Sequence, residues 1–140
     1  MAVTKEKLLE LLNKDIEWEF AAAIQYVQHA AVIKGAKFES IQKELLIHAN
    51  EEVLHAIMLC EQVDYLGGTP TVKVEKVLTS ADSLQMLKQD LAGERQAIAG
   101  YKERIGQAEA LREYGLRRIL EDILIQEEEH ERDIKSAVEE

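Results

Sequence analysis

The stretch QEEEHERD, residues 126–133, holds a glutamate and a histidine three positions apart in a run of helix-forming residues. Positions three apart lie on the same face of an α-helix, about one turn from each other. We therefore predict that Glu127 and His130 both face the protein core. The other glutamates of the stretch fall outside this face and are expected to be solvated: Glu128, Glu129 and Glu131.

The remainder of the chain predicts three further long helices, at about residues 4–34, 38–66 and from 80–82 onward. Thr4 is a plausible N-cap, and Gly35 is expected to cap the first helix at its C-terminal end. The segment GGTP, residues 67–70, ends the second helix, and the turn before the fourth falls within residues 108–115. Residues 67–79 lack a helical period, but extended they reach roughly 40 Å, about the length of a 28-residue helix. We expect an all-α fold, a single domain over residues 1–140: an antiparallel four-helix bundle with one long crossover between helices two and three.

Apolar residues at alternating steps of three and four predict the inner face of each helix. On the first helix this face is expected to begin at Leu9, and on the second to include His48 and Gln62. Polar residues interrupt the four faces near their middles, and they recur after 75 residues. The recurring pairs are Glu19 and Glu94, Tyr26 and Tyr101, Glu52 and Glu127, and His55 and His130.

An antiparallel hairpin brings together residues that are equally far from its turn. The midpoint between Glu19 and Glu52 falls at residues 35–36, so these two glutamates should face each other, and the 75-residue repeat predicts the same for Glu94 and Glu127. Four carboxylates and two imidazoles then meet in the core, where like charges repel. Two divalent ions would balance the four negative charges, and imidazole ligands favour Fe, Mn, Zn or Co over Ca or Mg.

The composition narrows the possible partners and the compartment. The chain has 17 Lys and Arg against 27 Asp and Glu, a net charge of −10, which argues against nucleic acid or an anionic membrane as a partner. Cys60 is the single cysteine, so an intrachain disulfide is excluded. The start of the chain lacks the pattern of a signal peptide, and no apolar run is long enough to span a bilayer. We expect a cytoplasmic protein.

This pattern resembles the ferritin-like di-iron carboxylate superfamily, and within it the bacterioferritin family. The segments that carry the resemblance are EFAAAIQY (19–26), NEEVLHA (50–56), LGGTP (66–70) and QEEEHE (126–131). The resemblance implies six ligands to two iron ions: Glu52 and Glu127 as bridges, Glu19 and Glu94 as terminal ligands, and His55 and His130 with one iron each. It also implies that Tyr26 and Tyr101 hydrogen-bond these ligands or donate electrons to the site.

The sequence departs from the bacterioferritin pattern at several positions. Val53 stands where that family has its haem-ligating methionine, so no haem is expected, and a fifth helix is not expected because only ten residues follow His130. Glu51 and Gln126 stand where the family often has aspartates, so the hydrogen bonds to the two ligand histidines should differ. Rubrerythrins, the nearest competing family, carry a glutamate at the position of Ala97.

Two histidines fall outside the ligand pattern. His48 is interpreted either as a ligand to a third metal, with Glu51, or as an ordinary hydrogen-bonded histidine. His29 is expected on the surface.

The resemblance implies a ferroxidase that oxidises Fe(II) to Fe(III) with O2 or H2O2, for iron storage or detoxification. Two Fe ions per chain are expected, with Mn or Zn as possible occupants, in a homo-oligomer. One alternative is a peroxidase or an enzyme like manganese catalase, which also uses a carboxylate and histidine site in a bundle. A second is a non-catalytic helical module that assembles with itself or a partner around structural zinc.

Overall fold

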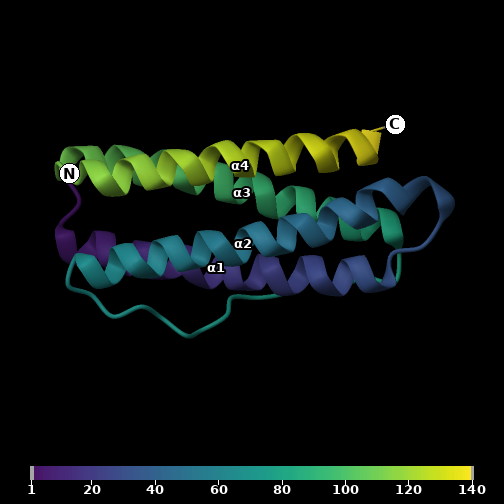
Figure 1. Ribbon diagram of the computed structural model, residues 1–140, viewed down its shortest axis with the longest axis horizontal. Helices are drawn as coiled ribbons and strands as arrows, with labels where there is room; N and C mark the ends of the chain where they lie inside the picture. Colours follow the sequence, from purple (N-terminus) through teal and green to yellow (C-terminus); the bar gives the residue numbers. More distant parts are fainter. Residues whose placement is uncertain (1, 140) are drawn as a thin grey trace.

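The computed structural model describes residues 2–139, which form four long helices and no strand. The helices are α1 (Lys5–Val32), α2 (Glu39–Tyr65), α3 (Ser83–Ala110) and α4 (Tyr114–Glu139), with a short 3-10 helix, η1 (Ala36–Phe38), between the first two. In Figure 1, α1 and α2 form one antiparallel hairpin, and α3 and α4 form a second hairpin that lies against it. The expected all-α four-helix bundle with one long crossover is confirmed. That residues 1–140 form one domain stays a prediction. Residues 1 and 140 lie outside the described residues.

Side chains cap the first helix of each hairpin, α1 and α3, at its N-terminal end. The Thr4 hydroxyl accepts a hydrogen bond from the backbone N–H of Lys7 (3.1 Å), as an N-cap does. At the other hairpin, the Asp82 carboxylate accepts from the backbone N–H of Gln85 (2.8 Å). The expected cap at Gly35 is wrong: α1 ends at Val32, and its C-cap is Ile33 in an extended conformation. Gly35 instead has φ +111° in the turn, a conformation that favours glycine.

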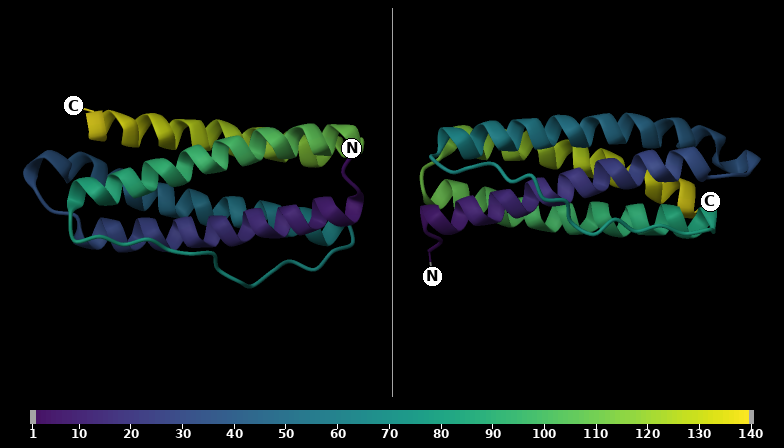
Figure 2. Two further views of the ribbon diagram at one scale, coloured as in Figure 1. Left: turned by 180° about the vertical axis from the view of Figure 1, so that it is seen from behind. Right: turned by 90° about the horizontal axis from the view of Figure 1, so that it is seen from below.

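The crossover between α2 and α3 lies along α1 (Figure 2) and is held there by polar side chains of α1. The Asn13 amide donates to the Thr69 carbonyl (3.0 Å), and the Asn13 amide oxygen accepts from the Thr71 N–H (2.9 Å). The backbone N–H of Leu78 donates to the side-chain oxygen of Gln25 (2.8 Å). These bonds satisfy backbone N–H and C=O groups of the crossover, because an extended segment cannot pair them with one another.

The apolar core divides into two clusters, one toward each end of the bundle. Leu8 is fully buried where Leu9 was expected, and Val63 is buried where Gln62 was expected, so the inner faces of α1 and α2 are shifted by one residue near this end. A strict seven-residue spacing drifts relative to a straight helix, which explains errors at the ends of a long stripe. Within residues 2–139, none of the helices is both long and apolar enough to cross a membrane.

Candidate metal centre

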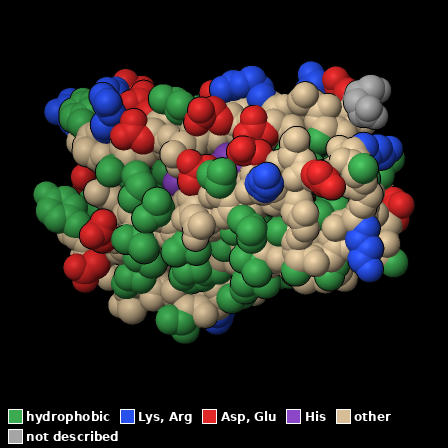
Figure 3. Space-filling view, turned by 45° about the vertical axis from the view of Figure 1, so that its right-hand side comes forward, with side chains coloured by type: hydrophobic (Ala, Val, Ile, Leu, Met, Phe, Trp, Pro, Cys, Tyr) green, Lys and Arg blue, Asp and Glu red, His purple; other side chains and the backbone are tan. Residues whose placement is uncertain are grey.

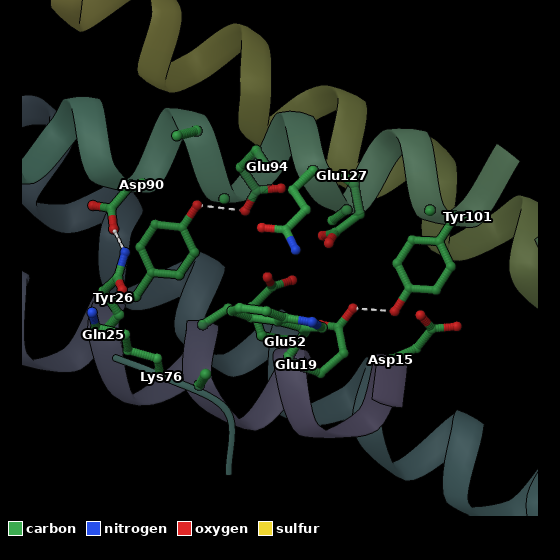
Figure 4. Close-up of a pocket in the computed structure, with 18 of the residues that line it drawn as sticks. Asp15, Glu19, Gln25, Tyr26, Glu52, Lys76, Asp90, Glu94, Tyr101 and Glu127 are labelled. Carbon is green, nitrogen blue, oxygen red and sulfur yellow. Dashed lines mark hydrogen bonds between the residues drawn. The ribbon is translucent and has the colours of Figure 1, made fainter. Parts of the chain in front are cut away.

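Between the two apolar clusters, the middle of the bundle holds six buried ionisable side chains from all four helices. Each is at most 3 % exposed: Glu19, Glu52, His55, Glu94, Glu127 and His130. They form two overlapping groups of four donors, whose ligand atoms lie within 4.8 Å of one another in each group. Glu52 and Glu127 belong to both groups; Glu19 and His55 complete one, and Glu94 and His130 complete the other. Figure 4 shows the four carboxylates converging on the same space between the helices.

The two imidazoles present the same nitrogen to this space. His55 Nδ1 lies 3.1 Å from Glu52 Oε1 and 3.4 Å from Glu19 Oε1. His130 Nδ1 lies 3.2 Å from Glu127 Oε1 and 3.4 Å from Glu94 Oε1. The sequence repeat is thus reproduced in space as two similar halves that share Glu52 and Glu127.

The hydrogen bonds of these side chains leave the inward atoms free. Six buried atoms of the centre have no hydrogen-bond partner within residues 2–139: Glu19 Oε1, Glu52 Oε1, Glu94 Oε2, Glu127 Oε1, His55 Nδ1 and His130 Nδ1. Buried polar atoms are almost always paired, so six unpaired atoms at one point indicate a missing partner. Four carboxylates and two imidazole nitrogens fit two transition-metal ions in both charge and ligand type.

The outward atoms of the same side chains are held by neighbours. The hydroxyl of Tyr26 donates to Glu94, and that of Tyr101 donates to Glu19, both as dashed lines in Figure 4. His130 Nε2 lies 2.8 Å from Glu51 Oε1, while His55 Nε2 contacts the side-chain oxygen of Gln126. Partners of this kind fix how a ligand is oriented, so the donors are positioned before any ion binds.

A second pair of contacts ties α1 to α3 on either side of the centre. Arg104 makes a two-pronged ion pair with Asp15 (2.7 and 3.1 Å), and His29 Nδ1 lies 2.9 Å from both oxygens of Asp90. The prediction that His29 is on the surface is wrong: it is completely buried, and its Nε2 lies 3.1 Å from the Leu78 carbonyl. The 75-residue repeat would have revealed these contacts, because it relates Asp15 to Asp90 and His29 to Arg104.

His48 lies beside the centre. It is buried, its ring stacks on that of His130 with centroids 4.0 Å apart, and its Nε2 lies 3.1 Å from Asp133. Its expected partner Glu51 bonds His130 instead. Glu44, His48 and Asp133 form a third, more open group of possible ligands.

Burial and mutual repulsion perturb the acids of the centre. Burial and the charge of Glu127 raise the pKa of Glu19 to about 7 and that of Glu94 to about 8. Burial and the other three glutamates also raise the pKa of Glu52. Burial alone would raise the pKa of Glu127, but the adjacent His130 and Glu52 side chains lower it.

The histidines respond to the same acids. Burial alone would lower the pKa of His55, but the neighbouring carboxylate of Glu19 raises it to about 9. Burial likewise opposes the charged form of His130, whose pKa is raised to about 11 by the nearby carboxylates of Glu127 and Glu94. Burial and the neighbouring His130 lower the pKa of His48 to about 4. Without metal, the centre therefore holds protons in place of cations.

A cavity of about 340 Å³ leads from the surface to this centre, between α1, α3 and the crossover. Exposed residues such as Lys14 and Lys76 line its outer part, and all four carboxylates line its inner part. Neither His55 nor His130 lines it. Small molecules and ions can therefore approach the centre from the side of the carboxylates.

Comparisons with known proteins identify the family of this chain. Residues 9–140 match the Ferritin family, described as a ferritin-like domain. The chain is 27 % identical to a bacterioferritin of Brucella melitensis over 125 residues, which cover 89 % of this chain and 78 % of the relative. It is 32 % identical over 119 residues to a "Nutrient stress-induced DNA-binding protein" of Nostoc sp., covering 78 % of this chain but 65 % of that relative, just under two thirds of its length.

Solved structures agree with these sequence matches. A ferritin-like, diiron-carboxylate protein from Bacillus anthracis superposes with a TM-score of 0.92 at 30 % identity, covering 99 % of both chains. The bacterioferritin-related protein of Bacteroides fragilis, described as a dodecameric thioferritin, superposes with a TM-score of 0.90 at 29 % identity, covering 97 % of this chain and 86 % of that one. The shared fold and the buried cluster of glutamates and histidines, which suggests two metal ions, agree with the family match. Because that match covers nearly the whole sequence, this chain belongs to the ferritin-like domain family.

Proposed function

We propose that the protein is a ferroxidase, with Fe(II) as the substrate and the six buried donors as its binding site. The observation that carries the proposal is the set of six unpaired inward atoms, four from carboxylates and two from imidazoles. Glu52 and Glu127 would bridge two iron ions, Glu19 and Glu94 would bind one each, and each histidine would bind one through Nδ1. The bacterial ferritin and bacterioferritin relatives support this assignment at the level of the family.

The charge of the site favours the oxidised product. Carboxylates are hard, negative ligands that stabilise Fe(III) more than Fe(II), so binding four of them makes the loss of an electron easier. Two Fe(II) ions side by side can give up two electrons together, which is the number that converts O2 to H2O2 or H2O2 to water. The cavity beside the carboxylates supplies the path for ion and oxidant. Tyr26 and Tyr101 would keep Glu94 and Glu19 in place during this change.

Fe(II) added without air to the metal-free protein, followed by O2, tests the proposal. We expect a fast rise in ferric absorbance that saturates near two irons per chain. Glu127→Ala should abolish the fast phase because it removes a bridging ligand. Glu129→Ala, an exposed glutamate on the same helix, is the matched control and should behave as wild type.

The same measurements separate the alternatives. A structural zinc site predicts no fast ferric absorbance at all. A centre like that of manganese catalase predicts manganese in protein purified from its own host and turnover with H2O2 alone. The DNA-binding activity in the name of the Nostoc relative is not part of the proposal, because a net charge of −10 opposes contact with phosphates.

A further inference from the structure

A chain of hydrogen bonds joins the two ligand histidines on the side away from the metal space. The Gln126 amide nitrogen donates to Glu51 Oε2 (3.3 Å), and Glu51 Oε1 lies 2.8 Å from His130 Nε2. The Gln126 oxygen contacts His55 Nε2. All four side chains lie between α2 and α4.

The chemistry of the amide fixes the direction of these bonds. A carboxylate can only accept, so the group of Gln126 that faces Glu51 must be its NH2, and its oxygen is left to accept from His55. His55 and His130 therefore each carry a proton on Nε2. In the neutral rings the lone pair is then on Nδ1, which is the unpaired atom that faces the metal space in both.

The two ends of this chain are chemically unequal. Positions 51 and 126 are related by the 75-residue repeat, yet one is a carboxylate and the other a neutral amide. His130 donates to a full negative charge, whereas His55 donates to a neutral oxygen. A charged acceptor makes the stronger hydrogen bond and makes the imidazole a better electron donor to a metal ion.

The side chains packed around the two histidines also differ in polarity. The ring of His48 stacks on His130 at 4.0 Å, and its other side reaches Asp133. The repeat places Ile123 at the position that corresponds to His48, and Ile123 is fully buried. The surroundings of His130 are thus more polar than those of His55, which favours a cation there.

We propose that Glu51 and Gln126 make the two metal positions unequal, so that a divalent ion fills the position beside His130 first and the position beside His55 second. This inference rests on the proposed function only in that the six donors bind two metal ions. Both residues act as positioning residues through the histidines. A partner of this kind typically changes metal affinity by about 10–100-fold, which sets the expected separation of the two binding steps.

Calorimetry with Co(II) under anaerobic conditions measures the two steps without any turnover. Wild type should bind two ions per chain in resolved steps that differ by about 10–100-fold in affinity. Gln126→Glu should strengthen the second step and bring the two together, and Glu51→Gln should weaken the first. Glu129→Gln, exposed on the same helix as Gln126, should leave both steps unchanged.

Crystals of wild-type protein loaded with one Co(II) per chain identify the position filled first. Anomalous scattering should lie beside His130, and because this needs no variant, it stands even if a substitution prevents folding. Equal affinities with cobalt shared evenly between the two positions would overturn the inference and leave the ferroxidase proposal intact. Failure to bind any Co(II) or Fe(II) would overturn both.

Discussion

At the scale of single residues, the buried acids of the centre destabilise the metal-free protein. Glu19 and Glu94 are almost fully buried beside other acids, and burial raises the pKa of each carboxyl. A buried carboxylate without a counter-charge is unfavourable, so the empty site takes up protons instead. Sites shaped for function commonly carry such a cost in stability.

These protons make the stability of the metal-free protein depend on pH between about 6.5 and 9. Over most of this range an unfolded chain has ionised glutamates and largely neutral histidines, because the ordinary histidine pKa is about 6.5. The folded chain keeps extra protons on Glu19, Glu94, His55 and His130, whose pKa values are raised to about 7, 8, 9 and 11. Because the folded state binds more protons, the free energy of unfolding should fall as the pH rises. Glu94 alone contributes about 2 kcal/mol of this decrease.

Urea unfolding of metal-free protein at several pH values measures this slope. Glu94→Gln should make the dependence of the unfolding free energy on pH shallower, because an amide cannot lose the proton that Glu94 holds. Glu129→Gln, on the surface of α4, should not change it. A free energy of unfolding that stays constant or increases from pH 6.5 to 9 would show that the buried acids are not protonated as described.

Zn²⁺, which has no redox chemistry, should replace the same protons. The increase in melting temperature on adding two equivalents of Zn²⁺ should be larger at pH 8.5 than at pH 6.5, because fewer protons compete for the donors. The reaction should also acidify a weakly buffered solution, which a pH electrode records. Glu127→Ala should lose most of the stabilisation. Equal stabilisation at both pH values, with no proton release, would contradict the prediction.

At the scale of helices, α1 and α3 are joined by buried acid–base contacts, and one of these also holds the crossover. Asp90 is 3 % exposed, accepts from the Gln25 amide (2.9 Å) and lies against His29. Gln25 and His29 in turn bond the backbone N–H and carbonyl of Leu78. One carboxylate therefore positions two side chains that fasten the connection between the hairpins.

Removing this carboxylate should loosen the crossover. Asp90→Ala leaves a buried histidine nitrogen and a buried amide without a partner, which should cost about 3 kcal/mol of unfolding free energy. Trypsin should then cut faster after Lys73 and Lys76, which are exposed on the crossover. Asp64→Ala, an exposed aspartate on α2, is the matched control. Unchanged stability and cleavage rates in Asp90→Ala would rule out this role.

The helical period explains what the sequence could and could not predict about these elements. Steps of three and four placed Glu127 and His130 inside and Glu129 outside, because a long helix offers only one inner face. His29 was misplaced because it lies at the edge of the inner face of α1, where burial depends on how closely α3 packs. Which atom pairs with which, such as Gln126 with His55, depends on packing between distant helices and is not encoded in a local period.

At the scale of the whole molecule, the outer face of the first hairpin is unusually apolar. Exposed apolar side chains follow α2 at helical spacing and continue on α1: Leu46, Ile47, Val53, Leu54 and Ile57, with Ile24 and Val27. Figure 3 shows hydrophobic side chains gathered over the half of the molecule that contains α1, α2 and the crossover. A large exposed apolar patch marks an interaction surface. The structural neighbour from Bacteroides fragilis is described as dodecameric.

We therefore expect the protein to be a homo-oligomer that buries the α1–α2 face between chains. Leu54 and Ile57 keep 55 % and 49 % of their surface exposed in one chain, so charges placed there should not disturb the bundle core. The double substitution Leu54→Glu and Ile57→Glu should shift the mass measured by light scattering toward the 15.9 kDa monomer, because two glutamates per chain would have to be desolvated at the interface. Val72→Glu, a comparable change at a residue 90 % exposed on the crossover, should leave the mass of the oligomer unchanged. If instead the double variant keeps the wild-type mass, or wild type is itself monomeric at micromolar concentration, the chains do not associate through this face.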